Sequence, residues 1–210
     1  MGKFILIRIA LGFLSLLAVS VLIFAATEIL PGDVASAVLG QGATPETLAA
    51  FRKELGLDRP ATVRYFEWFW GAIQGDFGQA LTNKREILPE LMKKFKNTLF
   101  LAGVAALIAV PLSVGLGIIA AINEGKWQDR WSNIISLATI SVPEFFIAYV
   151  LILVFAVKLR WFPSLSTVFD GMPLSEMLYK ITLPAVTLTF LVAAHMLRMT
   201  RSSVLAIMSQ

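Results

Sequence analysis

The sequence predicts an all-α protein that crosses a membrane several times as a polytopic helical bundle. Hydrophobic residues make up 57% of the 210 residues and charged residues 15%, whereas soluble domains average about a quarter charged residues. The apolar residues gather in four long runs, and a polar stretch over residues 31–96 follows the first run. We therefore expect four transmembrane helices and one small helical insertion outside the cytoplasm. The predicted domains are residues 1–30, 31–96 and 97–210.

The composition argues against several classes of site. The chain has no Cys and one His, so we expect no thiolate zinc site, no multi-histidine metal site and no cofactor in this chain. The net charge is only +4 and no basic cluster alternates with aromatic residues, so we expect no nucleic-acid partner. The sequence contains no Walker A motif. We therefore expect that the chain is not an enzyme and that any ATP hydrolysis is done by another subunit.

The first apolar run, residues 5–30, is interpreted as a retained membrane span. Lys3 and Arg8 precede an uncharged run of 19 residues, Ile9–Thr27. A cleaved signal peptide is the alternative, but its apolar core is typically about 7–15 residues long, and about 20 residues span a bilayer. Pro31 ends the run.

The polar stretch contains the signals of two short helices. Thr44 is a candidate N-cap with Pro45 at the first helical position, and Gly56 ends this helix. A second helix is expected from near Pro60 to Gly75, with one broad apolar side. That side consists of Val63, Phe66, Phe69, Trp70 and Ile73. Aromatic residues at this spacing form a local core or lie at the bilayer interface, and a surface for a partner protein is the alternative.

The sequence Asp76-Phe77-Gly78 matches the magnesium motif of protein kinases. The glycine-rich loop and the H-R-D motif of kinases are both missing from the chain. We therefore interpret these residues as a turn.

The second span is predicted at Asn97–Asn123, which has no charged residue. Three lysines, at positions 93, 94 and 96, lie just outside it. Small residues recur along it at intervals of three and four, which lets another helix approach closely in lipid. They are Ala102, Ala106, Ala109, Ser113, Gly117 and Ala120. Gly115-x-Gly117-x-x-Ala120 also matches the dinucleotide fingerprint, but inside an apolar span it indicates helix packing.

The third span is predicted at Ile134–Val157, after a polar turn over Glu124–Asn133. Glu144 lies near its middle, where an ionised carboxylate costs about 3 kcal/mol on insertion scales. One interpretation is a pathway carboxylate that faces water or a cationic part of a substrate. The other is a hydrogen-bonded residue beside a helix break at Pro143, where freed backbone groups need partners.

The fourth span is predicted at Ile181–Leu197, beginning near Leu183-Pro184. Seventeen residues reach only about 26 Å, so the span needs flanking turns or a thinned bilayer, and apolar residues after Arg201 suggest that the helix continues. Four spans put both termini on one side. The short segments carry six Lys and Arg on the N-terminal side and three on the other, which predicts a cytoplasmic N-terminus. The nine basic residues of residues 31–96 oppose this, but loops beyond about 60 residues count little.

Several ordered motifs over the whole chain resemble the dipeptide, oligopeptide and nickel permease family of ABC importers. They are Pro31-Gly32-Asp33, Leu55-Gly-Leu-Asp-Arg-Pro60, Arg64-Tyr65, Trp68, Gly75-Asp-Phe-Gly78, Ser141-Val-Pro-Glu-Phe145, Leu183-Pro184, Thr187-Leu188 and Arg198-Met-Thr-Arg-Ser-Ser203. The resemblance implies a six-span permease subunit of the bacterial inner membrane that works by alternating access. It implies four kinds of partner: a second permease, two cytoplasmic ATPases that bind ATP and Mg, a periplasmic or lipid-anchored solute-binding protein, and a substrate. Peptides, opines, nickel chelates and glycosides are all carried by relatives.

The resemblance also gives expectations for particular residues. Trp68, Trp70, Asp76 and Phe77 would belong to a periplasmic cap or docking surface for the binding protein. Arg198, Arg201 and Ser202 would lie near the segment that couples to the ATPase. In the family an E-A-A helix and two more spans follow, so the chain to Gln210 looks like about the first two-thirds of a permease. A channel or scaffold that needs no ATPase is the alternative function.

Overall fold

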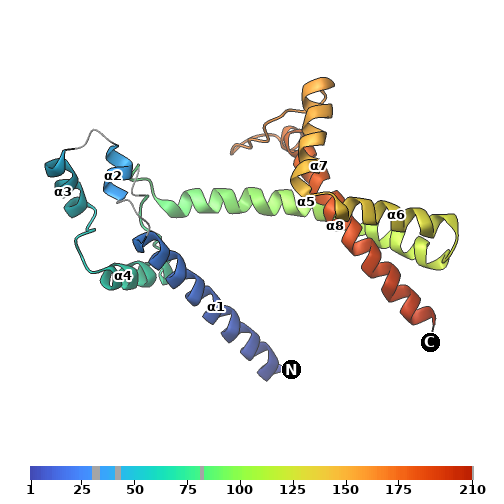
Figure 1. The fold of residues 1–210 in the computed structure, drawn as a ribbon, viewed down its shortest axis with the longest axis horizontal. Helices are drawn as coiled ribbons and strands as arrows, with labels where there is room; N and C mark the ends of the chain where they lie inside the picture. Colours follow the sequence, from blue (N-terminus) through green and yellow to red (C-terminus); the bar gives the residue numbers. More distant parts are fainter. Residues whose placement is uncertain (30–33, 41–43, 81–82, 210) are drawn as a thin grey trace. The chain divides into compact units, whose positions relative to one another are not determined.

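The computed structural model describes residues 1–29, 34–40, 44–80 and 83–209. The secondary structure in these ranges is helical apart from one isolated β-bridge between Gln79 and Glu86. The helices are α1 (Gly2–Ile29), α2 (Val34–Leu39), α3 (Pro45–Glu54), α4 (Ala61–Ile73), α5 (Ile87–Ile122), α6 (Trp127–Ser141), α7 (Glu144–Leu151), the π-helix η1 (Ile152–Lys158) and α8 (Leu174–Met208) (Figure 1). The all-α class is confirmed.

Three helices, α1, α5 and α8, are long and apolar enough to cross a membrane, and a fourth span results if the bent pair of α6 with α7–η1 is counted as one. The chain divides into two compact units, Met1–Met92 and Lys93–Gln210. The predicted domain boundaries after residues 30 and 96 stay predictions. The predicted polytopic helical membrane fold is confirmed.

The third span, predicted at Ile134–Val157, is not one continuous helix: it breaks at Pro143, where one of the two interpretations of Glu144 placed a helix break. The α6 and α7–η1 segments meet at an angle of 97°. The break falls at Val142, which is extended with φ −94° and ψ 129°. Pro143 explains it, because its ring disfavours a helical conformation of the preceding residue and it has no backbone N–H to donate.

Three boundaries differ from the sequence-based expectation. Helix α5 begins at Ile87 instead of Asn97, so the three lysines at 93, 94 and 96 lie inside it. The polar turn is shorter than expected, because α6 already begins at Trp127. Helix α8 runs over Leu174–Met208 with Pro184 inside it, so the expected continuation after Arg201 is confirmed, whereas the expected start near Leu183-Pro184 is wrong.

The first unit begins with α1 and contains the two short helices that the sequence predicts. The Thr44 hydroxyl accepts a hydrogen bond from the N–H of Thr47 at 3.3 Å, with Pro45 in the first turn of α3. Gly56 ends α3 with φ +65°. Both signals of the sequence are confirmed, and α4 begins directly after Pro60.

Helix α4 packs on the C-terminal half of α1 through one tyrosine. Tyr65 is 8% exposed, and its hydroxyl lies 2.7 Å from the hydroxyl of Ser20. Its ring lies 5.3 Å from that of Phe24 and stacks on Phe69 at 6.0 Å. No side chain of α1 is buried. These contacts therefore fix α4 on a helix that otherwise exposes its surface.

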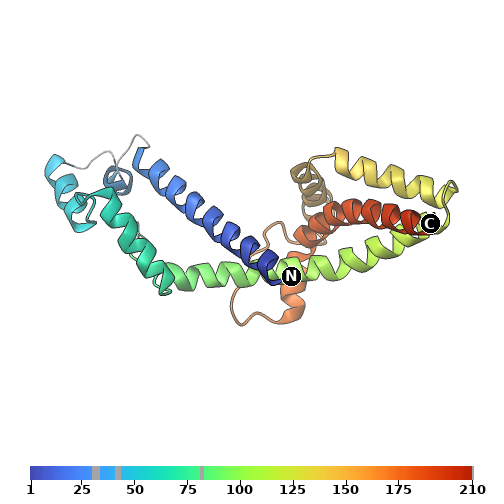
Figure 2. The same cartoon turned by 90° about the horizontal axis from the view of Figure 1, so that it is seen from below.

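In the second unit, α8 passes between α6 and the C-terminal half of α5 (Figure 2). The buried face of α5 is a stripe of small residues. It consists of Ala105, Ala109, Ser113, Gly117, Ala120 and Ala121. Four of these were predicted, whereas the predicted Ala102 and Ala106 are exposed because the stripe continues back along the helix in steps of four, to Ala105. A Cβ atom at Gly117 would lie 2.7 Å from the Cβ atom of Thr200, so the packing interpretation of this motif is confirmed.

Candidate functional site

The break in the third span places Glu144 at the start of a helix. Glu144 lies in the first turn of α7, directly after Pro143, and is exposed. Glu144 therefore lies beside the helix break, as one of its two interpretations from the sequence supposed. The first N–H groups of a helix have no partner within the helix, and the helix dipole favours negative charge there. The bend thus gives the carboxylate a favourable electrostatic environment.

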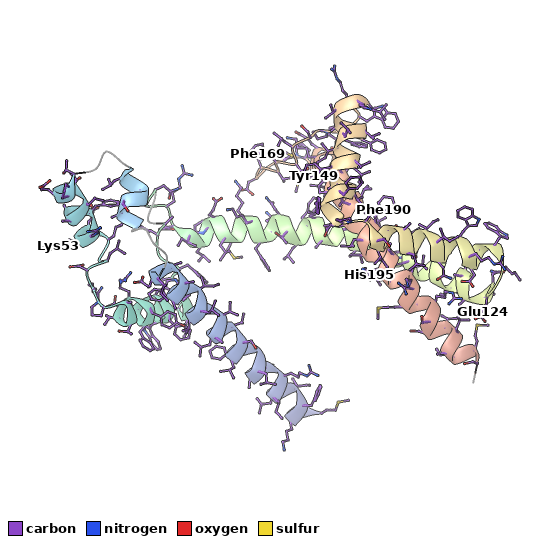
Figure 3. The ribbon with its side chains drawn as sticks, viewed as in Figure 1. Lys53, Glu124, Tyr149, Phe169, Phe190 and His195 are labelled. Carbon is purple, nitrogen blue, oxygen red and sulfur yellow. The ribbon has the colours of Figure 1, made fainter. Side chains whose placement is uncertain are left out.

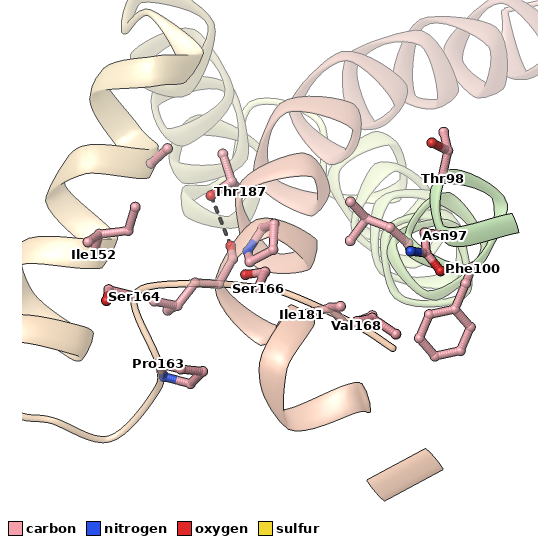
Figure 4. Close-up of a pocket in the computed structure, with 14 residues that line it drawn as sticks. Asn97, Thr98, Phe100, Ile152, Pro163, Ser164, Ser166, Val168, Ile181 and Thr187 are labelled. Carbon is pink, nitrogen blue, oxygen red and sulfur yellow. Dashed lines mark hydrogen bonds between the residues drawn. The ribbon is translucent and has the colours of Figure 1, made fainter. Parts of the chain in front are cut away.

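A cavity of about 340 Å³ lies in the second unit, between α5, α7–η1, α8 and the loop before α8 (Figure 4). Its lining is Asn97, Thr98, Phe100, Leu101, Ala148, Ile152, Pro163, Ser164, Ser166, Val168, Ile181, Leu183, Pro184 and Thr187. None of these lining residues is charged. The loop runs from the α7 side past α8 to the α5 side and carries Ser164, Ser166 and Val168 in turn (Figure 4).

The polar groups of the cavity are one amide and several hydroxyls. The Thr187 hydroxyl donates a hydrogen bond to the carbonyl oxygen of Leu183 at 3.0 Å (Figure 4), which leaves its oxygen lone pairs as acceptors. Asn97, Ser164 and Ser166 supply both donors and acceptors. Such a lining can bind the uncharged polar groups of a ligand, such as amide bonds or hydroxyls.

Glu144 lies on the face of α7 that continues into the cavity wall. Ala148 and Ile152 line the cavity, and they follow Glu144 by four and eight positions. Residues four apart lie one above the other on a helix. The carboxylate is therefore one turn from the neutral lining of the cavity.

Aromatic contacts hold the loop over Pro163–Val168 in place. The Tyr179 hydroxyl donates to the carbonyl oxygen of Trp161 at 3.0 Å, and its ring lies 5.7 Å from that of Phe162. Further along the loop, the Nζ atom of Lys180 lies 5.6 Å from the centre of the Phe169 ring (Figure 3). The loop is thus a preformed wall of the cavity.

The inner side of the bend is lined by a separate apolar pocket of about 360 Å³. Val142 and Phe146 belong to its lining, together with Phe190 of α8 (Figure 3). The bend therefore separates an apolar pocket from the mixed cavity around Asn97.

The other predicted site residues lie in the first unit or near the end of α8. The carboxylate of Asp76 accepts a hydrogen bond from the N–H of Gly78 at 2.8 Å, so the predicted turn is confirmed. Trp68 and Phe77 line a groove beside α1, whereas Trp70 is 65% exposed and is not part of that lining. The two tryptophans are two positions apart and therefore lie on different faces of α4, so only Trp68 lines the groove.

The three predicted residues of α8 have different environments. Arg201 donates two hydrogen bonds to the carboxylate of Asp129 in the first turn of α6. Arg198 is exposed, and its carbonyl oxygen accepts a hydrogen bond from the Ser202 hydroxyl at 2.9 Å. Sequence reasoning missed Asp129, because we placed it in a loop. A helix that begins at Trp127 has Asp129 in its first turn, where an acidic residue is favoured by the helix dipole.

Sequence reasoning also missed the polar residues of the cavity. Ser164 and Ser166 lie in a loop without periodicity, and Asn97 was interpreted only as the start of a span. No sequence pattern known to us marks such a group, because it forms from three separate segments.

The comparisons with known proteins agree with one another. Residues 1–102 match the family model described as the N-terminal part of a binding-protein-dependent transport system membrane component. Residues 113–210 match the model of a binding-protein-dependent transport system inner membrane component. A Brucella abortus protein named as a peptide transport system permease is 35% identical over 211 residues, which cover 100% of this chain and 67% of the relative. The glutathione transport system permease protein GsiC of Escherichia coli K12 is 35% identical over 196 residues, which cover 93% of this chain and 61% of the relative.

Proposed function

The chain belongs to the family of binding-protein-dependent transport system inner membrane components, the permease subunits of ABC importers, and on this premise we propose that it forms half of a translocation pathway for peptides or a related small solute. Members of this family are non-enzymatic components of transport systems, and the chain is a multi-pass membrane protein. Transport would proceed by alternating access, driven by ATP hydrolysis on other subunits.

The cavity beside the broken third span is the observation that carries this proposal. Irregular backbone at membrane depth is tolerated where it is buried in protein or lines a water-filled cavity. Transporters use such broken helices to place substrate sites. The break at Pro143, the exposed Glu144 and the neutral lining one turn further on provide this arrangement in the second unit.

The chemistry of the site favours a substrate with an ammonium group and amide bonds. Relatives are named for peptide transport and for glutathione transport, and both kinds of solute carry these groups. Glu144 would pair with the ammonium group, and the amide and hydroxyls of Asn97, Ser164 and Ser166 would bind the amide bonds. An opine, a nickel chelate or a glycoside is the alternative substrate class and would depend less on Glu144.

The partners of the chain follow from the family in general terms. Binding-protein-dependent ABC transport requires an ATPase and a solute-binding protein. We propose one further permease and two ATPases in the complex, with the N-terminus of this chain in the cytoplasm. In that orientation α3 and α4 face the periplasm, and Trp70 offers an exposed apolar contact for the binding protein. Arg198 and Ser202 would lie near the segment that receives the motion of the ATPase.

Uptake by the assembled importer in proteoliposomes tests the proposal. We expect Glu144→Gln to reduce ATP-dependent uptake of a dipeptide with a free amino group about tenfold, as for the loss of one charge-assisted hydrogen bond. Uptake of the N-acetylated dipeptide should not change between the two proteins. Glu176→Gln is the matched control, because Glu176 is also exposed in the first turn of a helix.

Two results would contradict the proposal. Equal uptake by the wild type and the Glu144→Gln variant would remove this residue from the pathway. Uptake that continues without ATP would instead identify a channel.

A further inference from the structure

A second large hollow lies entirely within the first unit and shares no lining residue with the cavity of the proposed pathway. It is a groove of about 730 Å³ between the C-terminal half of α1, α4 and the segments on either side of α4. Its apolar side chains are Leu16, Val19, Ile23, Phe24, Leu55, Leu57, Trp68, Phe77 and Ile87. We call it the α1 groove. Its shape and lining suit a long apolar chain.

Three charged residues line the α1 groove, Arg59, Arg64 and Glu67, and they take part in two ion pairs, one of them with Glu28, which is not itself part of the lining. The Nη2 atom of Arg64 lies 2.6 Å from a carboxylate oxygen of Glu28, and Arg64 lines the groove. Arg59 and Glu67 also line it and form a pair with two hydrogen bonds, one of them 2.8 Å long. The four side chains carry two positive and two negative charges, so the polar edge of the groove has no net charge.

We propose that the α1 groove binds a phospholipid with a phosphoethanolamine headgroup. One acyl chain lies along the apolar wall, and the headgroup lies across the two ion pairs. Phosphate oxygens accept hydrogen bonds from Arg59 and Arg64, and the ammonium group donates to Glu28 and Glu67.

The position of the groove along α1 indicates a lipid. Helix α1 is one of the membrane-spanning helices, and none of its side chains is buried. Apolar residues of α1 therefore also form one wall of the groove, with Leu16, Val19 and Ile23 on it. Trp68 and Tyr65 of α4 lie beside the C-terminal half of α1. Trp and Tyr are enriched where a membrane meets water.

The charges indicate a zwitterionic headgroup that can donate hydrogen bonds. A guanidinium group has five N–H donors and a carboxylate has about four acceptor sites, so each ion pair keeps unused capacity for a headgroup. A phosphocholine group has no N–H donor for the two glutamates. A phosphoglycerol group brings one negative charge and no positive charge to an edge that is already neutral.

Lipid retention by the purified protein tests this inference. The protein is purified in mild detergent with the subunits that accompany it, stripped of lipid, and mixed with vesicles of equal parts phosphatidylethanolamine, phosphatidylcholine and phosphatidylglycerol with the same acyl chains. Native mass spectrometry then counts the bound lipids. We expect phosphatidylethanolamine to be retained preferentially. Equal retention of the three lipids, or no retention, would overturn the proposal.

Two substitutions localise the bound lipid. Glu67→Gln keeps the size of the side chain and should reduce retention of phosphatidylethanolamine about tenfold. Trp68→Ala should also reduce it, whereas Trp70→Ala should not, because Trp70 does not line the groove. Equal effects of the two tryptophan variants would place the lipid elsewhere.

A photo-crosslinker at position 68 in the intact membrane tests the alternative occupant. Crosslinks to phosphatidylethanolamine support the proposal. Crosslinks to a second permease subunit in place of lipid would overturn it, because the groove would then be a protein interface.

Discussion

Arg201 of α8 donates two hydrogen bonds to Asp129 of α6, which lies 72 positions earlier in the chain. The Nε–Oδ1 distance is 2.5 Å and the Nη2–Oδ2 distance is 2.8 Å. Asp129 is 5% exposed, and it also accepts hydrogen bonds from the N–H of Gly125 and the amide of Asn133. The carboxylate is thus completely satisfied where the turn before α6 meets α8. This pair fixes the start of α6 on α8.

Loss of this pair should destabilise the second unit. We expect Arg201→Gln to reduce the free energy of unfolding by about 3 kcal/mol, because it leaves a buried carboxylate without its cation. Unfolding by sodium dodecyl sulfate in mixed micelles, followed by tryptophan fluorescence, measures the change. Arg198→Gln is the matched control, since Arg198 is exposed on the same helix, and a similar loss there would contradict the assignment.

The crossing of α5 and α8 depends on one glycine. A Cβ atom at Gly117 would lie 2.7 Å from the Thr200 Cβ atom and 3.0 Å from the carbonyl oxygen of Leu197, so Gly117→Ala should force the helices apart at a cost of about 1–3 kcal/mol. At Gly115 a Cβ atom would meet nothing within 4 Å. Gly115→Ala should therefore stabilise α5 slightly. The same unfolding assay distinguishes the two, and a stabilised Gly117→Ala variant would show that the crossing is not close.

The bend of the third span depends on Pro143. We expect Pro143→Ala to let Val142 become helical and to straighten the segment, which moves its two ends apart. Double electron–electron resonance spectroscopy with spin labels at positions 131 and 157 measures this distance. Pro184→Ala is the control, because Pro184 lies inside a continuous helix. An unchanged distance in Pro143→Ala would mean that packing against α8 alone maintains the bend.

The exposed pair of Arg59 and Glu67 predicts a pH effect. The hydrogen bonds from Arg59 lower the pKa of Glu67, so the folded protein binds this proton less readily than the unfolded chain. The stabilisation is therefore complete above the usual pKa of about 4.3 and disappears as the pH falls through the lower folded value. A titration of the Glu67 carboxyl carbon by NMR should return to the usual value in Arg59→Gln and not in Lys53→Gln. No difference between these variants would argue against the pair.

Local signals in the sequence predict the small helices well, because each depends on neighbouring residues. Thr44 with Pro45 and Gly56 with its positive φ need no distant contact. The sequence suggested a helix break at Pro143 as one of two interpretations, but an apolar run does not show the angle at which its two halves meet. Pro111 and Pro184 lie inside continuous helices, whereas Pro143 ends one, and proline alone does not distinguish these outcomes.

The candidate site was predicted only in part, because distance in the chain hides most of it. Glu144 was recognisable as a carboxylate within an apolar run. The neutral residues Asn97 and Ser164, which line the cavity, come from two other segments of the chain. Arg201, the partner of Asp129, is likewise far from it in the sequence. Contacts of this kind require the tertiary fold.

Val142 has the backbone connections of a hinge between α6 and α7. Among the described backbone hydrogen bonds outside the helices, none connects the chain before Val142 with the chain after Pro143. A turn of two dihedral angles at Val142 can therefore swing α7–η1 while both helices keep all their internal bonds. Packing against α8 and the hydrogen bond from the Tyr179 hydroxyl to the carbonyl oxygen of Trp161 resist this movement, so the side chains of α8 determine the direction of the helix that carries Glu144, while Arg201 holds α6.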